Sequence, residues 1–226
     1  MKMPSDVLSG LPSGWFIRNA IIPLVLVVLA LPSRAAGLVE GTDYRTLDPP
    51  QHSDSPPGKI EVLEFFSWGC PHCNEFDPLI TRWAQKAPKD VVLERIATGM
   101  GRTAWTNLAR AYYALESLGF AESLDAPVFH AIHEEHQPLF DEGAIAAWVG
   151  KHGVDQVKFR TAFDSFGVNT RLNQAEQMVE NYKVEGVPSL AVGGKYIVLG
   201  SSYEEIITHL DAVVAKVRAE RSAAHN

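Results

Sequence analysis

Cysteine is scarce in this sequence: its 226 residues contain only Cys70 and Cys73. A framework of structural disulfides needs more cysteines and usually closes longer loops, so a disulfide-stabilised scaffold is excluded. Zinc normally takes four ligands, and no second cysteine pair exists to complete such a site. Any sulfur redox chemistry of this chain must therefore take place at this one pair.

Basic clusters and long apolar runs are absent too. The 20 Lys and Arg residues stand against 27 Asp and Glu without forming a cluster, so we expect no nucleic-acid partner. The apolar run from Ala20 to Leu31 has 12 residues, short of the roughly 20 that a helix needs to span a bilayer.

Residues 1–36 have the layout of a secretory signal peptide, because Lys2 and Arg18 precede the apolar run and small residues follow it. We expect cleavage after residue 35, 36 or 37, which leaves 17 Lys and Arg against 26 Asp and Glu. No cysteine precedes position 70 to carry a lipid, and no twin-arginine pair is present. General secretory export into an oxidising compartment is therefore expected, with an uncleaved membrane anchor as the alternative interpretation.

The hydrophobic pattern predicts an α/β fold with an inserted all-helical subdomain. Strands are predicted at 59–67, 90–98, 189–192 and 195–199, and helices at 71–86, 168–184 and 202–221. The first strand–helix–strand unit implies a parallel crossover. Only helical stripes occur over 99–166, which we assign to the insertion, with 59–98 and 167–222 as the main domain. Residues 37–58 form a turn-rich linker, with a short edge strand expected at Tyr44–Leu47.

The sequence Cys70-Pro71-His72-Cys73 stands where an apolar strand gives way to a helix. Cysteines three apart in a first helical turn can meet disulfide geometry with little backbone movement. Free N–H groups and the helix dipole favour a thiolate at Cys70, and His72 adds a second favourable neighbour. Pro71 suits the first helical position because it has no N–H to leave unpaired. We expect Cys70 to be a low-pKa nucleophile and the more buried Cys73 to be the resolving thiol.

Val187-Pro188 follows a helix-ending glycine and precedes a strand, so it is a candidate cis peptide. In this order of elements the loop lies beside the start of the Cys70 helix. A cis bond would turn the N–H and C=O groups of Val187 toward an extended peptide, which could pair there as an added strand. A trans proline at a strand start is the alternative.

Glu61 and Glu64 have opposite parity in the first strand, so they point to opposite faces of the sheet. Glu61 lies near the strand start and is expected in solvent, whereas Glu64 has apolar neighbours and is expected to be buried. A carboxyl buried beneath the disulfide would have a raised pKa and could relay a proton to or from Cys73. A solvated carboxylate at a sheet edge is the alternative.

Three histidines lie three apart on a predicted helix, a spacing that suggests a metal site: His130, His133 and His136. Their Glu, Gln and Pro neighbours are typical of a solvated helix end, so we expect a surface face and no metal. No cofactor is expected either, and packing is the expected role of three tryptophans, Trp68, Trp105 and Trp148.

Two stretches resemble the bacterial DsbA-type thiol:disulfide oxidoreductases of the thioredoxin superfamily. The first is 62–67 leading into Cys70-Pro71-His72-Cys73, and the second is 186–189 followed by Gly193-Gly194-Lys195-Tyr196. The helical block between them is similar as well, and the resemblance extends from about residue 59 to the end of the chain.

The resemblance implies a thioredoxin-like fold with an inserted helical domain, located in the periplasm. There the protein would oxidise cysteine pairs of reduced exported polypeptides through a mixed disulfide at Cys70. A quinone-linked, DsbB-like membrane partner would reoxidise it. Five residues fall on positions of the family's motifs: Cys70, Cys73, His72, Glu64 and Pro188.

One position departs from the family pattern. Trp68-Gly69 stands where family members often carry bulkier aromatic residues before the first cysteine. Gly69 removes a side chain from the peptide-binding surface, which bears on client preference and on partner docking.

An exported disulfide isomerase or reductase is the nearest alternative function. Isomerases of this fold dimerise through an added N-terminal domain, for which residues 37–58 are too few, so we expect a monomer. A plain structural disulfide is another interpretation of the cysteine pair. A module that holds a client or a metal without turnover is the alternative from a different class, and the missing second ligand cluster argues against the metal.

Overall fold

A computed structural model describes residues 37–53 and 55–224, and the signal peptide expected over 1–36 lies outside them. Five strands in the described residues form one mixed sheet in the order β1-β5-β4-β2-β3. They are β1 (Tyr44–Thr46), β2 (Ile60–Phe66), β3 (Val91–Ala97), β4 (Ser189–Val192) and β5 (Tyr196–Val198). β2 and β3 are parallel, as the strand–helix–strand pattern predicts, and the other neighbours are antiparallel.

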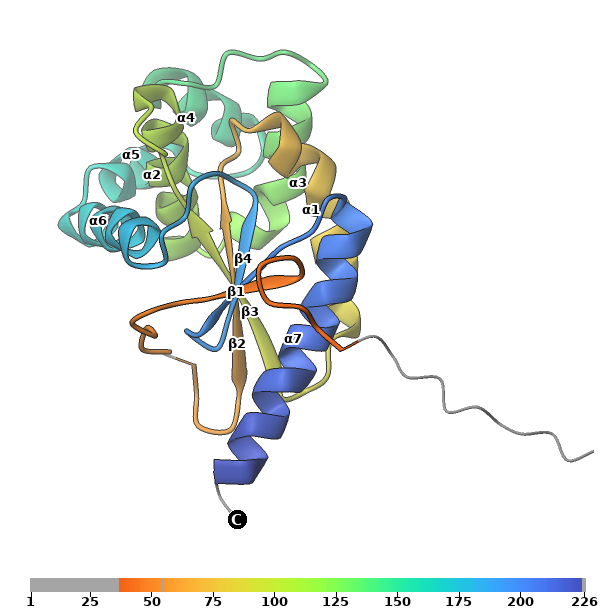
Figure 1. The fold of residues 1–226 in the computed structure, drawn as a ribbon. Helices are drawn as coiled ribbons and strands as arrows, with labels where there is room; N and C mark the ends of the chain where they lie inside the picture. The colour runs from red at the N-terminus through yellow and green to blue at the C-terminus, as the bar shows by residue number, and fades with distance from the viewer. Residues whose placement is uncertain (1–36, 54, 225–226) are drawn as a thin grey trace, which may run out of the picture. The chain divides into compact units, whose positions relative to one another are not determined.

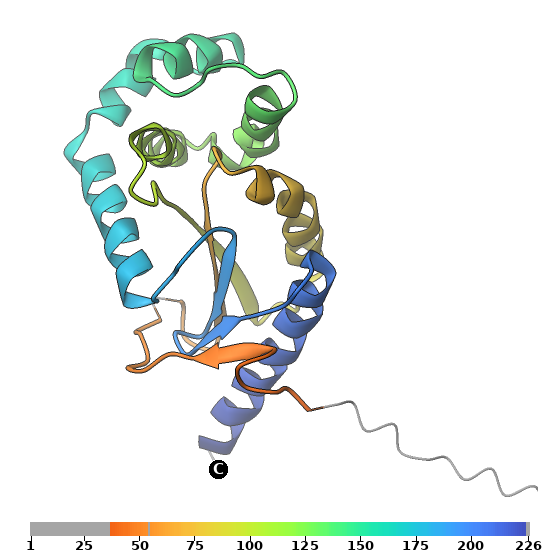
Figure 2. The same ribbon diagram turned by 45° about the horizontal axis from the view of Figure 1, so that its top comes forward.

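Seven helices accompany the sheet in the described part of the chain. They are α1 (Pro71–Lys86), α2 (Thr103–Ser117), α3 (Ala121–His133), α4 (Glu142–Lys151), α5 (Gln156–Phe163), α6 (Phe166–Asn181) and α7 (Tyr203–Ala224). α1 and α7 lie side by side (Figure 1), and α6 lies on the opposite side of the sheet from α7 (Figure 2). The predicted α/β fold with a helical insertion is confirmed. None of the described helices is both long and apolar enough to cross a membrane.

Each face of the sheet has its own apolar core, because every residue of β2 is buried. Ile60 and Val62 pack with α1 and α7 on one face, whereas Leu63 and Phe65 pack with the helical block on the other. Burying one such side chain stabilises a fold by about 1.5–3 kcal/mol. Since the second core runs from the sheet into the helices of the block, the block is folded onto the sheet.

Glu61 is buried as well, with 2% of its surface exposed, so the solvent position predicted for it is wrong. The reason lies in the sheet order. β2 pairs with β3 on one side and β4 on the other, so even its first residues are covered.

The turn between β4 and β5 has the predicted two-residue form, with φ of +59° at Gly193 and +69° at Gly194. At Gly194 a side chain is also excluded by the neighbouring chain segment. Gln51 donates its N–H to the carbonyl of Gly194 at 2.7 Å, and a Cβ at position 194 would collide with the carbonyl oxygen of Gln51.

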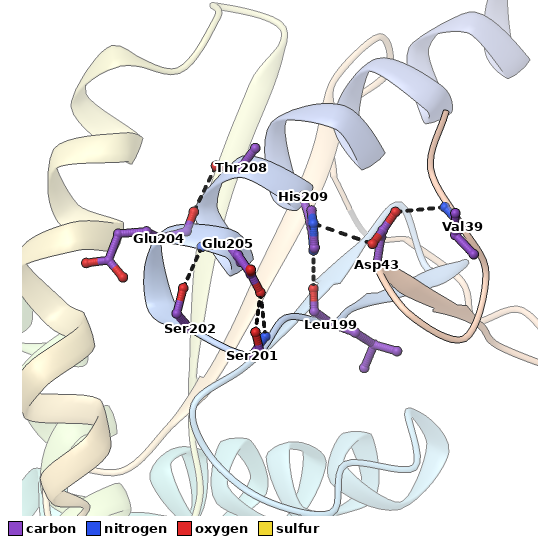
Figure 3. Close-up of polar contacts among 9 residues, drawn as sticks. All are labelled: Val39, Asp43, Leu199, Ser201, Ser202, Glu204, Glu205, Thr208 and His209. Atoms are coloured by element: carbon purple, nitrogen blue, oxygen red, sulfur yellow. Dashed lines mark hydrogen bonds and ion pairs between the residues drawn. The ribbon is translucent and has the colours of Figure 1, made fainter. Parts of the chain in front are cut away.

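Side-chain caps fix the start of α7. The Oγ of Ser202 accepts from the N–H of Glu205 at 3.2 Å, and the carboxylate of Glu205 accepts from the N–H of Ser201 at 2.9 Å (Figure 3). Ser202 and Glu205 have the sequence spacing of a capping box, and the Ser202 hydroxyl satisfies an N–H group that the helix start leaves free. The Glu205 side chain reaches one residue further, to the N–H of Ser201. Tyr203 is therefore held as the first residue of α7.

His209 ties the next turn of α7 to the rest of the fold. Its Nδ1 donates to the carbonyl of Leu199 at 2.6 Å, and its Nε2 lies 3.5 Å from Oδ1 of Asp43 (Figure 3). Asp43 in turn accepts from the N–H of Val39 at 2.8 Å. The first turns of α7 thus have fixed neighbours directly after β5 and in the chain before β1.

Candidate active site

The two cysteines lie where β2 gives way to α1. Cys70 has extended backbone angles (φ −91°, ψ 120°) as the residue that caps α1, and Pro71 is the first helical residue. The carbonyl of Cys70 accepts from the N–H of Asn74 at 3.1 Å, which starts the helix. Both thiols are free, with Cys70 4% exposed and Cys73 fully covered. The geometry places the more accessible sulfur at the helix N-terminus, as predicted for a nucleophile.

The environments of the two thiols differ sharply. The pKa of Cys70 is lowered to about 6, chiefly by a hydrogen bond from the Cys73 thiol, and burial opposes this. The N–H groups of Cys73 and His72 and the charge of His72 lower it further. Burial, followed by the same contact with Cys70, raises the pKa of Cys73. At neutral pH the pair therefore holds one proton, and it resides on Cys73.

The Val187–Pro188 peptide bond is cis and lies against the first cysteine. The Sγ of Cys70 lies 3.4 Å from the carbonyl oxygen of Val187. Both loop residues are partly exposed. The loop and the nucleophile thus form one surface, as predicted from the order of elements.

His72 is an exposed residue of the first turn of α1, with 71% of its side chain accessible. Its Nδ1 lies 3.2 Å from the hydroxyl of Tyr203 and 3.7 Å from Oε2 of Glu75. No motif in the sequence predicts the contacts of Tyr203 and Glu75 with His72.

Glu64 is fully buried, as predicted. Its Oε2 accepts from Nε of Arg95 at 2.7 Å, while its Oε1 has no hydrogen-bond partner among the described residues. Burial raises the pKa of Glu64, and the charge of Arg95 opposes this only in part. The Glu64 carboxyl also acts electrostatically on Cys73, whose pKa it helps to raise. It is thus a buried acid–base group within electrostatic reach of the resolving thiol.

Arg95 is the centre of a charge cluster that the sequence did not reveal. Besides Glu64 it contacts Asp77 of α1 at 2.8 Å and Asp125 of α3. One guanidinium thus faces three carboxyl groups from three elements. The signal in the sequence is that Glu94 and Arg95 interrupt an apolar strand. That Arg95 is the register partner of Glu64 is known only from the structure.

Helix α3 holds the loop that leads into the cysteines. Nε1 of Trp68 donates to Asp125 at 2.6 Å, and the backbone carbonyl of Trp68 lies 2.8 Å from Nε2 of His133. The predicted surface face therefore holds for His130 and His136, which are exposed, but only in part for His133, which is half-buried with its ring bonded to the loop. No three metal-ligating side chains are grouped to hold an ion within residues 37–53 and 55–224.

Gly69 does not leave a bare surface beside Cys70. The indole of Trp105, from α2, lies over it so closely that a Cβ at position 69 would stand 2.5 Å from Cδ1 of that ring. The guanidinium of Arg102 lies 4.2 Å from the centre of the same ring. The aromatic surface missing at Gly69 is thus supplied by Trp105, which is partly exposed, while Trp68 and Trp148 are buried.

Comparison with known proteins gives one consistent result. Residues 61–210 match the family model described as a DSBA-like thioredoxin domain. The thiol:disulfide interchange protein DsbA of Bordetella parapertussis is 39% identical over 179 residues, which cover 77% of this chain and 84% of that protein. The DsbA of Pseudomonas aeruginosa is 35% identical over 209 residues, covering 90% and 98%.

Solved structures agree. The crystal structure of Pseudomonas aeruginosa DsbA superimposes with a TM-score of 0.76 at 34% identity, covering 84% of this chain and 97% of that one. The DsbA oxidoreductase of Xylella fastidiosa also gives 0.76, at 31% identity, covering 80% and 98%.

Substitution of Gly69 by Ala should displace the indole of Trp105, because the added Cβ and the ring cannot share this space. Overpacking of this kind costs about 1–3 kcal/mol of unfolding free energy. Urea denaturation measures the loss, and tryptophan fluorescence reports the movement of the ring. Gly186→Ala is the matched control, since a Cβ there meets nothing within 4 Å.

A second substitution tests the cause. Adding Trp105→Ala to the Gly69→Ala variant removes the collision. The double variant should therefore lose less unfolding free energy than the sum of the losses measured for Gly69→Ala and Trp105→Ala alone. Equal stability of Gly69→Ala and the parent protein would contradict the close packing.

Proposed function

The chain belongs to the DsbA-like family of thioredoxin domains, and we propose that it acts in the periplasm as a dithiol oxidase that introduces disulfides into reduced exported polypeptides. It is a thiol:disulfide interchange protein, as its family membership and its Cys70–Cys73 pair indicate. The observation that carries the oxidase assignment is the contrast between the two thiols. Cys70 is a stabilised thiolate at a helix start, and Cys73 is a buried thiol.

This contrast sets the direction of exchange. A client thiolate attacks the Cys70 sulfur of the oxidised pair, which breaks the Cys70–Cys73 bond, and Cys73 leaves and takes up a proton. The second client thiolate then attacks the client sulfur of the mixed disulfide and expels Cys70 as a thiolate. Because a low-pKa thiol is a good leaving group, the second step is favoured. The client loses two electrons, and the pair gains them.

Reoxidation runs through a mixed disulfide with a membrane partner, for which we propose a quinone-linked, DsbB-like protein. Cys73 then has to attack Cys70, and it must first lose its proton. Glu64 is suited to accept that proton, because a carboxyl with a raised pKa is a stronger base than an exposed one. In the forward reaction the same group returns a proton to Cys73.

The cis Val187–Pro188 loop is the proposed docking site of the client backbone. An extended client segment would pair with Val187 as an added strand, which places a client cysteine beside Cys70. Pro71 and His72 complete the site: Pro71 starts the helix without a wasted N–H, and His72 supports the thiolate. We further propose that the protein acts as a monomer, without metal or cofactor.

A redox titration against glutathione tests the oxidase assignment. We expect the Cys70–Cys73 potential to lie above about −180 mV, the level of disulfide isomerases. The ratio of oxidised to reduced protein can be read after acid quenching and thiol alkylation. A potential near the roughly −270 mV of a thioredoxin-type reductant would overturn the assignment.

The thiolate itself gives the second test. Ultraviolet absorbance of the reduced protein should show a thiolate with a midpoint near pH 6, because the pKa of Cys70 is lowered to about 6. Cys70→Ser should abolish this transition. A midpoint near the value of about 8.5 found for free thiols would contradict the proposal.

The same pKa shift predicts how stability depends on pH. A thiol whose pKa is lower in the folded state stabilises the fold fully above its unfolded pKa, about 8.5, and this contribution is lost as pH falls through about 6. The reduced protein should therefore unfold at a higher temperature than the oxidised one at pH 8, and the difference should shrink toward pH 5. Calorimetry of both forms measures it, and a constant difference would argue against a stabilised thiolate.

Glu64→Gln should slow resolution of a mixed disulfide by about tenfold or more, because Cys73 loses its nearby base. The amide keeps the shape of the carboxyl, and Arg95 keeps Asp77 and Asp125 as partners, so the fold should persist. Stopped-flow decay of a Cys70 adduct with a model peptide measures the rate. Unchanged kinetics in a folded variant would reduce Glu64 to a structural role.

A further inference from the structure

Three polar side chains meet above the first turn of α1, and the reaction steps described so far use only one of them. The hydroxyl of Tyr203 lies 2.9 Å from Oε2 of Glu75 and 3.2 Å from Nδ1 of His72. Glu75 and His72 are themselves 3.7 Å apart. Tyr203 comes from α7, whereas the other two belong to α1, so the contact joins the catalytic turn to a distant element.

Elementary hydrogen-bond chemistry fixes the direction of these contacts. A carboxylate only accepts, so the single hydrogen of the Tyr203 hydroxyl is donated to Glu75. The phenol oxygen can then only accept from His72, which must carry its proton on Nδ1. The result is a chain in which His72 donates to Tyr203, and Tyr203 donates to Glu75. A carboxylate at its end polarises each donor toward it.

We propose that Tyr203 is a positioning residue for the exchange reaction: its hydroxyl links Glu75 to His72 and keeps the imidazole beside Cys70 with Nδ1 as the donor. This inference rests on the proposed function, because it assigns Tyr203 a role in stabilising the Cys70 thiolate. His72 is 71% accessible on its side chain, so it would otherwise sample several rotamers. The link to α7 limits that freedom.

The position of Tyr203 is well defined. It is the first residue of α7, behind the Ser202 cap, and its ring lies 5.5 Å from that of Phe76. Burial and the hydrogen bond to Glu75 raise the pKa of Tyr203 to about 12, and the charges of Cys70 and Cys73 contribute. The phenol therefore keeps its proton throughout the working pH range and stays available as a donor.

Glu75 can affect the Cys70 thiolate in two opposite ways, directly through its negative charge and indirectly through His72. A negative charge close to a thiolate disfavours it, and Glu75 belongs to the same helix start as Cys70. With its charge engaged by the Tyr203 hydroxyl and directed toward His72, the carboxylate instead favours a positively polarised imidazole. His72 is among the causes that lower the pKa of Cys70. Tyr203 thus converts an unfavourable neighbour of the thiolate into an indirect support.

The parent protein provides the first test. Nitrogen-15 NMR of reduced protein at about pH 9, where an imidazole is neutral, reports which ring nitrogen of His72 carries the proton. We expect the Nδ1–H form in the parent protein and a shift toward Nε2–H in Tyr203→Phe. The Nε2–H form in the parent protein would overturn the proposal, because the phenol would then have to donate to His72.

The second test is the redox equilibrium of Tyr203→Phe. The variant keeps the ring against Phe76 and loses only the hydroxyl, so the fold should be retained. We expect the Cys70–Cys73 pair to become less oxidising, with its equilibrium constant against glutathione shifted by about two- to fivefold, the size of one exposed charge-linked contact. The thiolate midpoint should rise in parallel. Tyr44→Phe, which removes a hydroxyl from β1, is the matched control and should leave both values unchanged.

A double-variant cycle shows whether Tyr203 acts through His72. In a His72→Ala background the effect of Tyr203→Phe should fall to within error. A full effect in that background, or an unchanged constant in Tyr203→Phe itself, would contradict the proposal. Both outcomes are differences between variants. They are therefore separate from the absolute potential of the parent protein, on which the oxidase assignment depends.

Discussion

A single guanidinium, that of Arg95, joins the elements on which the site is built. It contacts Glu64 of β2, Asp77 of α1 and Asp125 of α3, and only 15% of its side chain is exposed. Removing one partner of a buried ion pair typically costs about 3–5 kcal/mol, so sheet, catalytic helix and insertion depend on one another through this group. The cluster also has more negative than positive groups. Glu64 is the most buried of the three carboxyls, one of its oxygens has no hydrogen-bond partner among the described residues, and burial raises its pKa.

The two thiols form one coupled system. The contact between them lowers the pKa of Cys70 and raises that of Cys73, so a single proton is shared unequally and stays on the buried sulfur. This division suits the reaction. The accessible sulfur leaves a client without waiting for a proton, whereas the buried one needs a partner for proton transfer, and Glu64 lies on the same inner side of the fold. The group suited to proton transfer, Glu64, is thus buried in the core. The groups that stabilise the Cys70 thiolate, the helix start and His72, lie at the surface.

Local signals in the sequence predicted the strand-to-helix position of Cys70, the role of Pro71 at the helix start and the burial of Glu64. Each depends on residues a few positions away. The contacts that were missed join distant parts of the chain: Trp68 and Asp125 are 57 residues apart, and His72 and Tyr203 are 131 apart. No periodicity reveals such pairs. The error at Glu61 has the same origin, because its burial depends on the order of strands in the sheet, not on its place within one strand.

The helical insertion is therefore part of the active site and not a cover added to it. α3 holds both ends of the Trp68 residue, through Asp125 at the indole and His133 at the carbonyl, and so fixes the loop that delivers Cys70. α2 places Trp105 over Gly69, so the glycine permits an aromatic ring from another element to take the place of a local side chain. A bulkier residue at 69 would be anchored to the loop, whereas Trp105 is anchored to the insertion. In this protein the surface beside the nucleophile thus depends on how the insertion packs against the sheet.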